Sequence, residues 1–152
     1  MALEFNTIGV KLKWAVEATK GSRPLTGYVQ IPDIKGTPAI DINPNKIEVT
    51  NLEDQYRRYV DGVKDVGDSF DFTANLTADL KTKWNSCVSA ANAAWASQKA
   101  CWFEIAIPNF DSFYFAGIPG ELGVNEMSVD AVIESTLHIV PNQIGGWAAK
   151  ST

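Results

Sequence analysis

The stretch FDFTANLTADLKTKWNSCVSAANAAW, residues 70–95, contains two hydrophobic periods in succession. Residues 70–76 alternate apolar and polar side chains, which is the period of a strand with one buried face. Residues 78–98 repeat apolar side chains every three or four positions, which predicts an amphipathic helix, and Thr77 precedes them as a capping residue. The apolar stripe of this helix comprises Leu80, Trp84, Cys87, Val88, Ala91 and Trp95. The stretch therefore predicts a sheet that is covered by a helix.

Further strands are expected on both sides of this stretch. Alternation or β-branched and aromatic content predicts strands over 8–17, 27–31, 46–50, 101–107, 112–116 and 125–140. The last strand has Val129 on its apolar face and is either continuous or broken near Asp130. Several antiparallel strands with one helix indicate a mainly β fold of the α+β class, a two-sheet β-sandwich or a partly closed barrel. We expect one domain over residues 1–152, with flexible arms at 1–7 and 141–152.

Composition and charge exclude several classes of protein. The 152 residues are 45% hydrophobic and 20% charged, which is typical of a folded domain. A net charge of −5 disfavours a protein that reads nucleic-acid sequence, because such a surface repels phosphate. The N-terminus lacks the pattern of a secretory signal and no apolar run is long enough to span a bilayer, so we expect a cytosolic chain without membrane contact. The two cysteines are then expected to be buried thiols without a disulfide.

The sequence offers little for catalysis, and we expect no enzyme, cofactor or metal ion. His138 is the single histidine, and Glu134 lies on the same side of its strand but roughly 13 Å away. Gly117, Gly120 and Gly123 are turn residues, because no Lys-Ser/Thr pair and no helix follow them. An alternative function remains open: Trp102, Tyr114 and Trp147 could form a sugar platform on a carbohydrate- or protein-binding β-sandwich, although strand positions favour burial.

Residues 47–73, IEVTNLEDQYRRYVDGVKDVGDSFDFT, contain a strand that ends in Val-Thr, an arginine-bearing arm, Lys-Asp and Gly-Asp pairs, and a strand of alternating aromatics. In this order, these features resemble the major tail tube proteins of long-tailed, non-contractile bacteriophages. The resemblance continues through a tryptophan-containing helix, a hairpin of aromatic strands, a Gly-Val-Asn-Glu turn and a last strand. Relatives often have proline where this chain has Asp61.

The resemblance implies a fold like that of tail tube proteins and of the haemolysin-coregulated protein of type VI secretion. It implies a structural subunit that forms hexameric rings, which stack into a hollow conduit for double-stranded DNA. The implied partners are other copies of the chain, a tape measure protein inside the tube, and tail terminator and baseplate or distal tail proteins. The implied location is the virion tail, assembled in the host cytoplasm.

Two groups of residues are expected to serve assembly. Residues 50–68 have no sustained period and are expected to form an ordered loop or arm. This inter-subunit arm is expected to use Glu53, Asp54, Tyr56, Arg57, Arg58, Tyr59 and Lys64, since paired guanidinium groups bind facing carboxylates. Strand alternation places a second polar set on the face opposite the core, where it would line the lumen or, alternatively, the outer surface. This set comprises Asp71, Thr73, Asn75, Asp130, Glu134, Thr136 and His138. Asp68 precedes the same strand, but alternation puts it on the side of the core residues Phe70 and Phe72.

Overall fold

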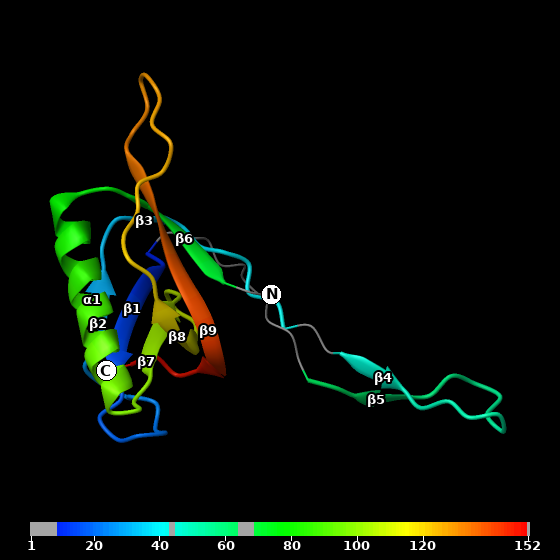
Figure 1. Ribbon diagram of the computed structural model, residues 1–152. Helices are drawn as coiled ribbons and strands as arrows, with labels where there is room; N and C mark the ends of the chain where they lie inside the picture. The colour runs from blue at the N-terminus through cyan, green and yellow to red at the C-terminus, as the bar shows by residue number, and fades with distance from the viewer. Residues whose placement is uncertain (1–8, 43–44, 64–68, 152) are drawn as a thin grey trace.

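The computed structural model describes residues 9–42, 45–63 and 69–151. Within these ranges the chain forms nine strands and one helix, which confirms the predicted mainly β fold (Figure 1). The elements are β1 Lys11–Val16, β2 Val29–Ile31, β3 Ile34–Gly36, β4 Lys46–Glu48, β5 Tyr59–Asp61, β6 Phe70–Asn75, α1 Ala78–Ala96, β7 Cys101–Ala106, β8 Ser112–Pro119 and β9 Glu134–Ala148.

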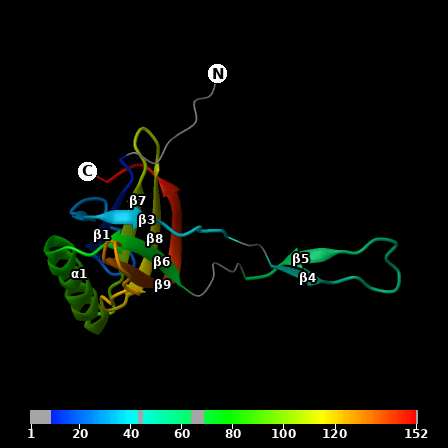
Figure 2. The same ribbon diagram turned by 90° about the horizontal axis from the view of Figure 1, so that it is seen from above.

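Seven of the strands form one antiparallel sheet that is nearly closed into a barrel. Their order is β2-β1-β7-β8-β9-β6-β3, so the two edge strands are consecutive in sequence and separated only by Pro32 and Asp33. Two intervening residues can span no more than about 11 Å between the strand ends. The sheet must therefore curl until its edges approach each other (Figure 2). Of the two architectures expected from the sequence, the partly closed barrel is the one observed.

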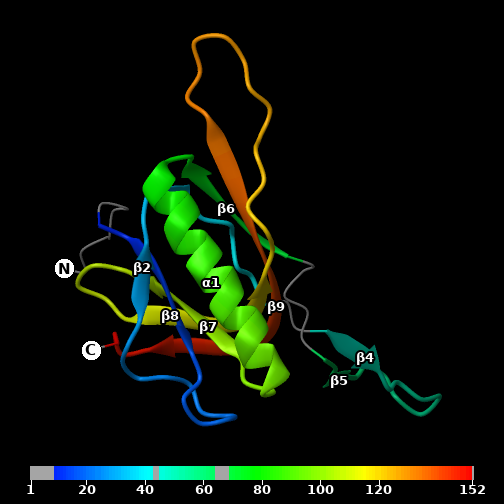
Figure 3. The same cartoon turned by 60° about the vertical axis from the view of Figure 1, so that its left-hand side comes forward.

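Helix α1 lies across the concave side of the sheet and closes the hydrophobic core (Figure 3). Phe70 and Phe103 pack against Phe115, with ring centroids 5.0 and 5.4 Å apart, and Trp84 of the helix is fully buried among the core residues. The helix begins as predicted, because the Thr77 hydroxyl accepts a hydrogen bond from the Leu80 amide at 3.1 Å.

The prediction that Trp95 is buried is wrong. Its side chain is 65% exposed, whereas Ala94 is buried in the last turn of α1. Trp95 has the right helical phase to follow Trp84 and Ala91, but phase only determines the direction of a side chain. It does not determine whether the sheet extends far enough to cover that side chain.

The prediction of a flexible C-terminal arm beginning at residue 141 is also wrong for most of that segment. Strand β9 runs from Glu134 to Ala148 and pairs with the whole length of β8. The register shifts twice, opposite Tyr114/Phe115 and Ala116/Gly117, and these irregularities break the period-two pattern in the sequence. The segment is ordered because the outer edge of β8 needs backbone partners. The N-terminal arm expected at 1–7 lies outside the described residues.

The strand expected over 125–140 begins only at Glu134. Asp130 adopts a left-handed conformation with φ of 61°, which turns the chain and ends any alternation. Residues 120–133 instead form a loop that projects beyond the end of the sheet (Figure 1). Val129, expected on a buried face, is 91% exposed in this loop.

Strands β4 and β5 form a separate two-stranded hairpin that extends away from the barrel (Figures 1 and 2). Lys46, Ile47 and Glu48 pair with residues 61, 60 and 59 in order. The segment expected to be a loop or arm over 50–68 therefore contains strand β5, and the strand expected over 46–50 ends at Glu48.

Replacing Gly117 with alanine is expected to lower the free energy of unfolding by about 1–3 kcal/mol, because overpacked cores force backbone shifts. A Cβ atom there would lie 2.7 Å from both the Ile139 Cγ2 atom and the Val140 carbonyl oxygen. Gly123→Ala is the matched control, since its Cβ would meet nothing within 4 Å. Urea denaturation of both variants checks this, and equal losses would contradict the close approach of β8 to β9.

Candidate assembly surfaces

The polar residues of β6 and β9 lie opposite one another on the face that points away from the core. The register pairs Asp71 with His138, Thr73 with Thr136, and Asn75 with Glu134. Their neighbours in both strands, including Phe72 and Leu137, are buried in the core. Strand alternation thus placed six of the seven polar candidates on one common face.

Charged contacts tie this polar face together. The Nδ1 atom of His138 lies 2.5 Å from the Asp71 Oδ1 atom, across the two strands. Lys35 of β3 forms a salt bridge with Glu134. Sequence reasoning missed Lys35, because three-residue β3 is too short to show a period. The face therefore carries two carboxylates, one ammonium group and one imidazole, and is less acidic than the predicted set alone implied.

One polar candidate, Asp130, is not on this face. Asp130 lies in the projecting loop, because β9 begins four residues later, so its assignment to the same strand as Glu134 is wrong. Asp68, like the arm residue Lys64, lies outside the described residues.

The hairpin of β4 and β5 carries the arm candidates at its far end. The Arg58 Nε atom donates to the Asp54 Oδ2 atom at 2.8 Å, and the same oxygen accepts from the Asn51 amide at 2.9 Å. The Arg58 amide donates to the Thr50 hydroxyl at 2.9 Å. Arg58 therefore stabilises the turn of its own arm. Arg57 is 76% exposed, and its ion pair with Glu48 is long, with 4.0 Å between the Nε and Oε1 atoms.

The arm also carries many exposed apolar side chains. Leu52 and Tyr56 are 106% and 82% exposed. Other exposed apolar side chains of the arm are Ile47, Val49, Tyr59, Val60 and Val63. So many exposed apolar side chains on one short hairpin favour a site of protein contact. A two-stranded ribbon is marginally stable alone, so a partner surface would stabilise it further.

A second network, which the sequence did not reveal, lies on the outer face of β7 and β8. Glu104 is fully buried and accepts hydrogen bonds from the Ser151 amide and hydroxyl at 3.0 and 2.8 Å, while its carboxylate lies 2.6 Å from the Tyr114 hydroxyl. Burial alone would raise the pKa of Glu104, but these hydrogen bonds outweigh it and hold the pKa below its ordinary value. Burial, together with the bond to Glu104, raises the pKa of Tyr114 to about 12.

This network fastens the end of the chain to the sheet. Ser151 and Ala149, whose carbonyl oxygen lies 2.6 Å from the Tyr114 hydroxyl, follow directly after β9. The guanidinium group of Arg23 lies 4.0 Å above the Tyr114 ring, so the loop between β1 and β2 also covers this face. The network is structural, because its polar atoms are occupied by neighbouring residues.

The alternative sugar platform is not assembled. Trp102 and Tyr114 are buried, 3% and 0% exposed, and only Trp147 of the three is accessible. The Trp147 ring packs edge-on against Phe113, with centroids 5.3 Å apart. One exposed ring does not form a stacking surface.

Chemistry-bearing side chains are sparse in the described residues. These residues contain no group of three or more His, Cys, Asp or Glu side chains that could hold a metal ion. Cys87 and Cys101 are buried free thiols, as expected. The pKa of Cys87 is raised above its ordinary value, mainly by a hydrogen bond with Cys101 and also by burial, so the thiol stays protonated. Within the described part of the chain, no helix has the length and apolarity needed to cross a membrane.

The fold is similar to that of chains in solved tail assemblies. A chain in the tail of an empty gene transfer agent particle with C6 symmetry matches with a TM-score of 0.58 and 16% identity, over 97% of this chain and 100% of that one. A chain of the native gene transfer agent virion matches with a TM-score of 0.58 and 16% identity, over 96% and 100%.

A chain of the six-fold symmetrised baseplate of the anti-feeding prophage matches with a TM-score of 0.54 and 8% identity, over 95% of both chains. No protein-family model and no curated protein sequence matches this chain. At these identities the likeness establishes a shared fold, that of a tail-tube-like barrel.

Proposed function

We propose that this chain is the repeating subunit of a phage-like tail tube and has no catalytic activity. The observation that carries the proposal is the match of fold over nearly the whole length of a chain from a C6-symmetric tail. The resemblance of residues 47–73 to the major tail tube proteins of long-tailed, non-contractile bacteriophages supports the same function, and it rests on sequence motifs and not on the fold. The subunit would form hexameric rings that stack into a hollow tube, located in the virion tail and assembled in the host cytoplasm.

The polar face of β3, β6 and β9 is the proposed wall of the channel. Asp71, Glu134 and His138 lie on the face of the sheet opposite the core, and the residues that alternate with them are buried. If six copies each supply about four inner strands, these three and one more, at about 4.8 Å spacing, the inner circumference is near 115 Å and the diameter near 37 Å. A duplex could pass through such a channel. Carboxylates on the wall would keep phosphate groups mobile.

The arm of β4 and β5 is the proposed contact with an adjacent subunit. It projects from the barrel and exposes Leu52 and Tyr56, which a neighbouring copy would bury. Arg57 supplies the outward-facing guanidinium group. Other partners of the same tube would be a tape measure protein inside it and tail terminator and baseplate or distal tail proteins at its ends.

Charge reversal at Arg57 is expected to abolish tube formation and to change the unfolding free energy by less than about 0.5 kcal/mol, since the side chain is exposed. Lys81→Glu is the matched control: it makes the same change in charge in the first turn of α1, where the helix dipole tolerates a carboxylate. Sedimentation velocity and negative-stain microscopy of both variants measure assembly. Normal-length tubes from Arg57→Glu would show that this group does not join subunits.

A further inference from the structure

The C-terminal end of α1 borders a groove that the proposed function does not use. A cavity of about 120 Å³ lies between the helix and β8, and an adjoining hollow of about 780 Å³ continues toward β1. The two share Trp95, Lys99, Ala100 and Asn142 as lining residues, so they form one surface. We call it the Trp95 groove; Ile118, Lys20 and Asn92 also line it.

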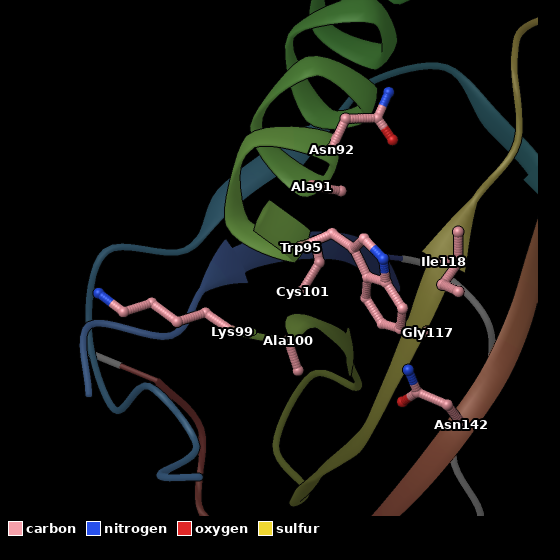
Figure 4. A pocket seen from close by; sticks show the side chains of 9 residues that line it. All are labelled: Ala91, Asn92, Trp95, Lys99, Ala100, Cys101, Gly117, Ile118 and Asn142. Atoms are coloured by element: carbon pink, nitrogen blue, oxygen red, sulfur yellow. The ribbon is translucent and has the colours of Figure 1, made fainter. Parts of the chain in front are cut away.

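The groove is apolar at its centre and basic at its border. The Trp95 ring points from the last turn of α1 toward Ile118 and Gly117 of β8 (Figure 4). Trp95 and Ile118 are 65% and 44% exposed, so this apolar surface is accessible. Lys20 and Lys99 line the border. The one carboxylate there, Glu17, is buried and accepts hydrogen bonds from Gly21, Ala100 and Trp102.

The opposite end of the body carries a segment with complementary properties. We call residues 126–133 the tip loop; every one of them is exposed. Met127, Val129 and Val132 are 62%, 91% and 68% exposed, and the charged residues of the loop, Glu126 and Asp130, are both acidic. An apolar tip with two carboxylates matches a groove with an apolar centre and a basic border.

The base of the tip loop is fixed, which holds the tip in a projecting position. The Asn125 amide donates to the Glu134 carbonyl oxygen at 3.0 Å, and the Thr136 hydroxyl donates to the Asn125 side chain at 2.9 Å. The Ser135 hydroxyl donates to the Gly123 carbonyl oxygen at 2.8 Å. Because the base is already held by these bonds, docking would have to order only residues 126–133.

The tip loop and the groove lie at opposite ends of the molecule. Helix α1 begins near the end from which the loop projects and runs away from it, so Trp95 in its last turn lies at the far end (Figures 1 and 3). One chain cannot bring the two together. Two different complementary surfaces on opposite ends give a head-to-tail contact, which repeats without limit or closes into a ring.

We propose that the tip loop of one copy docks in the Trp95 groove of the next copy, with Met127 and Val129 against Trp95 and Ile118, and Glu126 and Asp130 near Lys20 and Lys99. This proposal rests on the proposed self-assembly, and it adds a second contact between copies that is separate from the β4–β5 arm. Its polarity gives every copy the same orientation in the assembly.

Cross-linking between variants that each carry one added cysteine tests the docking directly. Met127→Cys is mixed with Asn92→Cys, whose side chain lines the groove, and treated with a short bis-maleimide; the native thiols are buried. Ser86→Cys, on another face of α1, replaces Asn92→Cys in the control mixture. Docked copies hold the two thiols at millimolar effective concentration, so the cross-linked dimer should exceed the control by about tenfold or more. The yield should fall at high salt.

A second variant measures what the contact contributes to assembly. Trp95→Ala should raise the protein concentration needed for assembly by about tenfold or more, as the loss of a central aromatic contact does. Leu25→Ala, another exposed apolar residue at 68% exposure, should have no effect.

The outcomes separate this docking from the tube itself. Cross-linked chains without hollow tubes would support the docking and contradict the tail tube function. Tubes that form without cross-linking above the control would overturn the docking and leave the function standing. If neither forms, both are wrong. If Trp95→Ala blocks assembly but Met127→Cys does not cross-link, a different segment occupies the groove and the docking of the tip loop is overturned.

Discussion

Replacing Trp84 with alanine is expected to lower the free energy of unfolding by about 3–5 kcal/mol, the range for a fully buried aromatic side chain. Trp84 has no exposed surface and lies between α1 and the concave face of the sheet. Its indole Nε1 atom also donates to the Gly120 carbonyl oxygen at 2.9 Å. A domain of this size is stabilised by about 5–15 kcal/mol, so the variant should lose a large share of its stability.

Two other variants separate the causes of this loss. Trp95→Ala, in the same helix, should cost less than about 1 kcal/mol, because its side chain is mostly exposed. Trp84→Phe keeps most of the apolar volume but removes the hydrogen bond to Gly120, so it should fall between the two. Urea denaturation followed by circular dichroism provides the comparison, with an unchanged slope indicating an unchanged denatured state. Equal stability of Trp84→Ala and Trp95→Ala would contradict the described core.

Placing lysines on the polar face of β6 and β9 is expected to convert a passive channel into one that retains DNA. The D71K/E134K double variant should still form tubes, since exposed ion pairs such as Asp71–His138 contribute only about 0–1 kcal/mol. Each new ammonium group that meets a phosphate releases counterions, so retention should be strong at low salt and fall steeply as salt rises.

A matched double variant controls for charge. D41K/D111K makes the same change in charge at two exposed positions that are not on the polar face. DNA held by D71K/E134K tubes should resist nuclease digestion, because it lies inside the wall, while DNA held by the control should be digested. Nuclease-sensitive DNA on the D71K/E134K tubes would place the polar face on the outer surface, which is the competing assignment.

The predictable parts of the fold are those where one local period persists. The alternation in β6 predicts its strand because one face of β6 lies in the core, whereas the hairpin of β7 and β8 is predicted by aromatic and β-branched runs on both sides of a turn. The cap at Thr77 was recognised from its side-chain chemistry. The pairing of Asp71 with His138 could not be predicted, since it depends on the register between strands separated by the whole helix.

The parts that were missed depend on tertiary context. Bulges hide the second half of β9 from pattern analysis, and the partner that orders it is the edge of β8. The exposure of Trp95 depends on where the sheet ends, and the exposure of Val129 on the left-handed turn at Asp130. The buried carboxylate of Glu104 gave no signal, because its partners Tyr114 and Ser151 follow at 10 and 47 positions along the chain.

Electron microscopy of the purified, concentrated chain tests the central claim most directly. The tail tube function predicts hollow tubes of uniform width whose averaged cross-section has six-fold symmetry and an open channel. Particles that stay monomeric at every concentration, or that assemble into fibres without a channel, would contradict it.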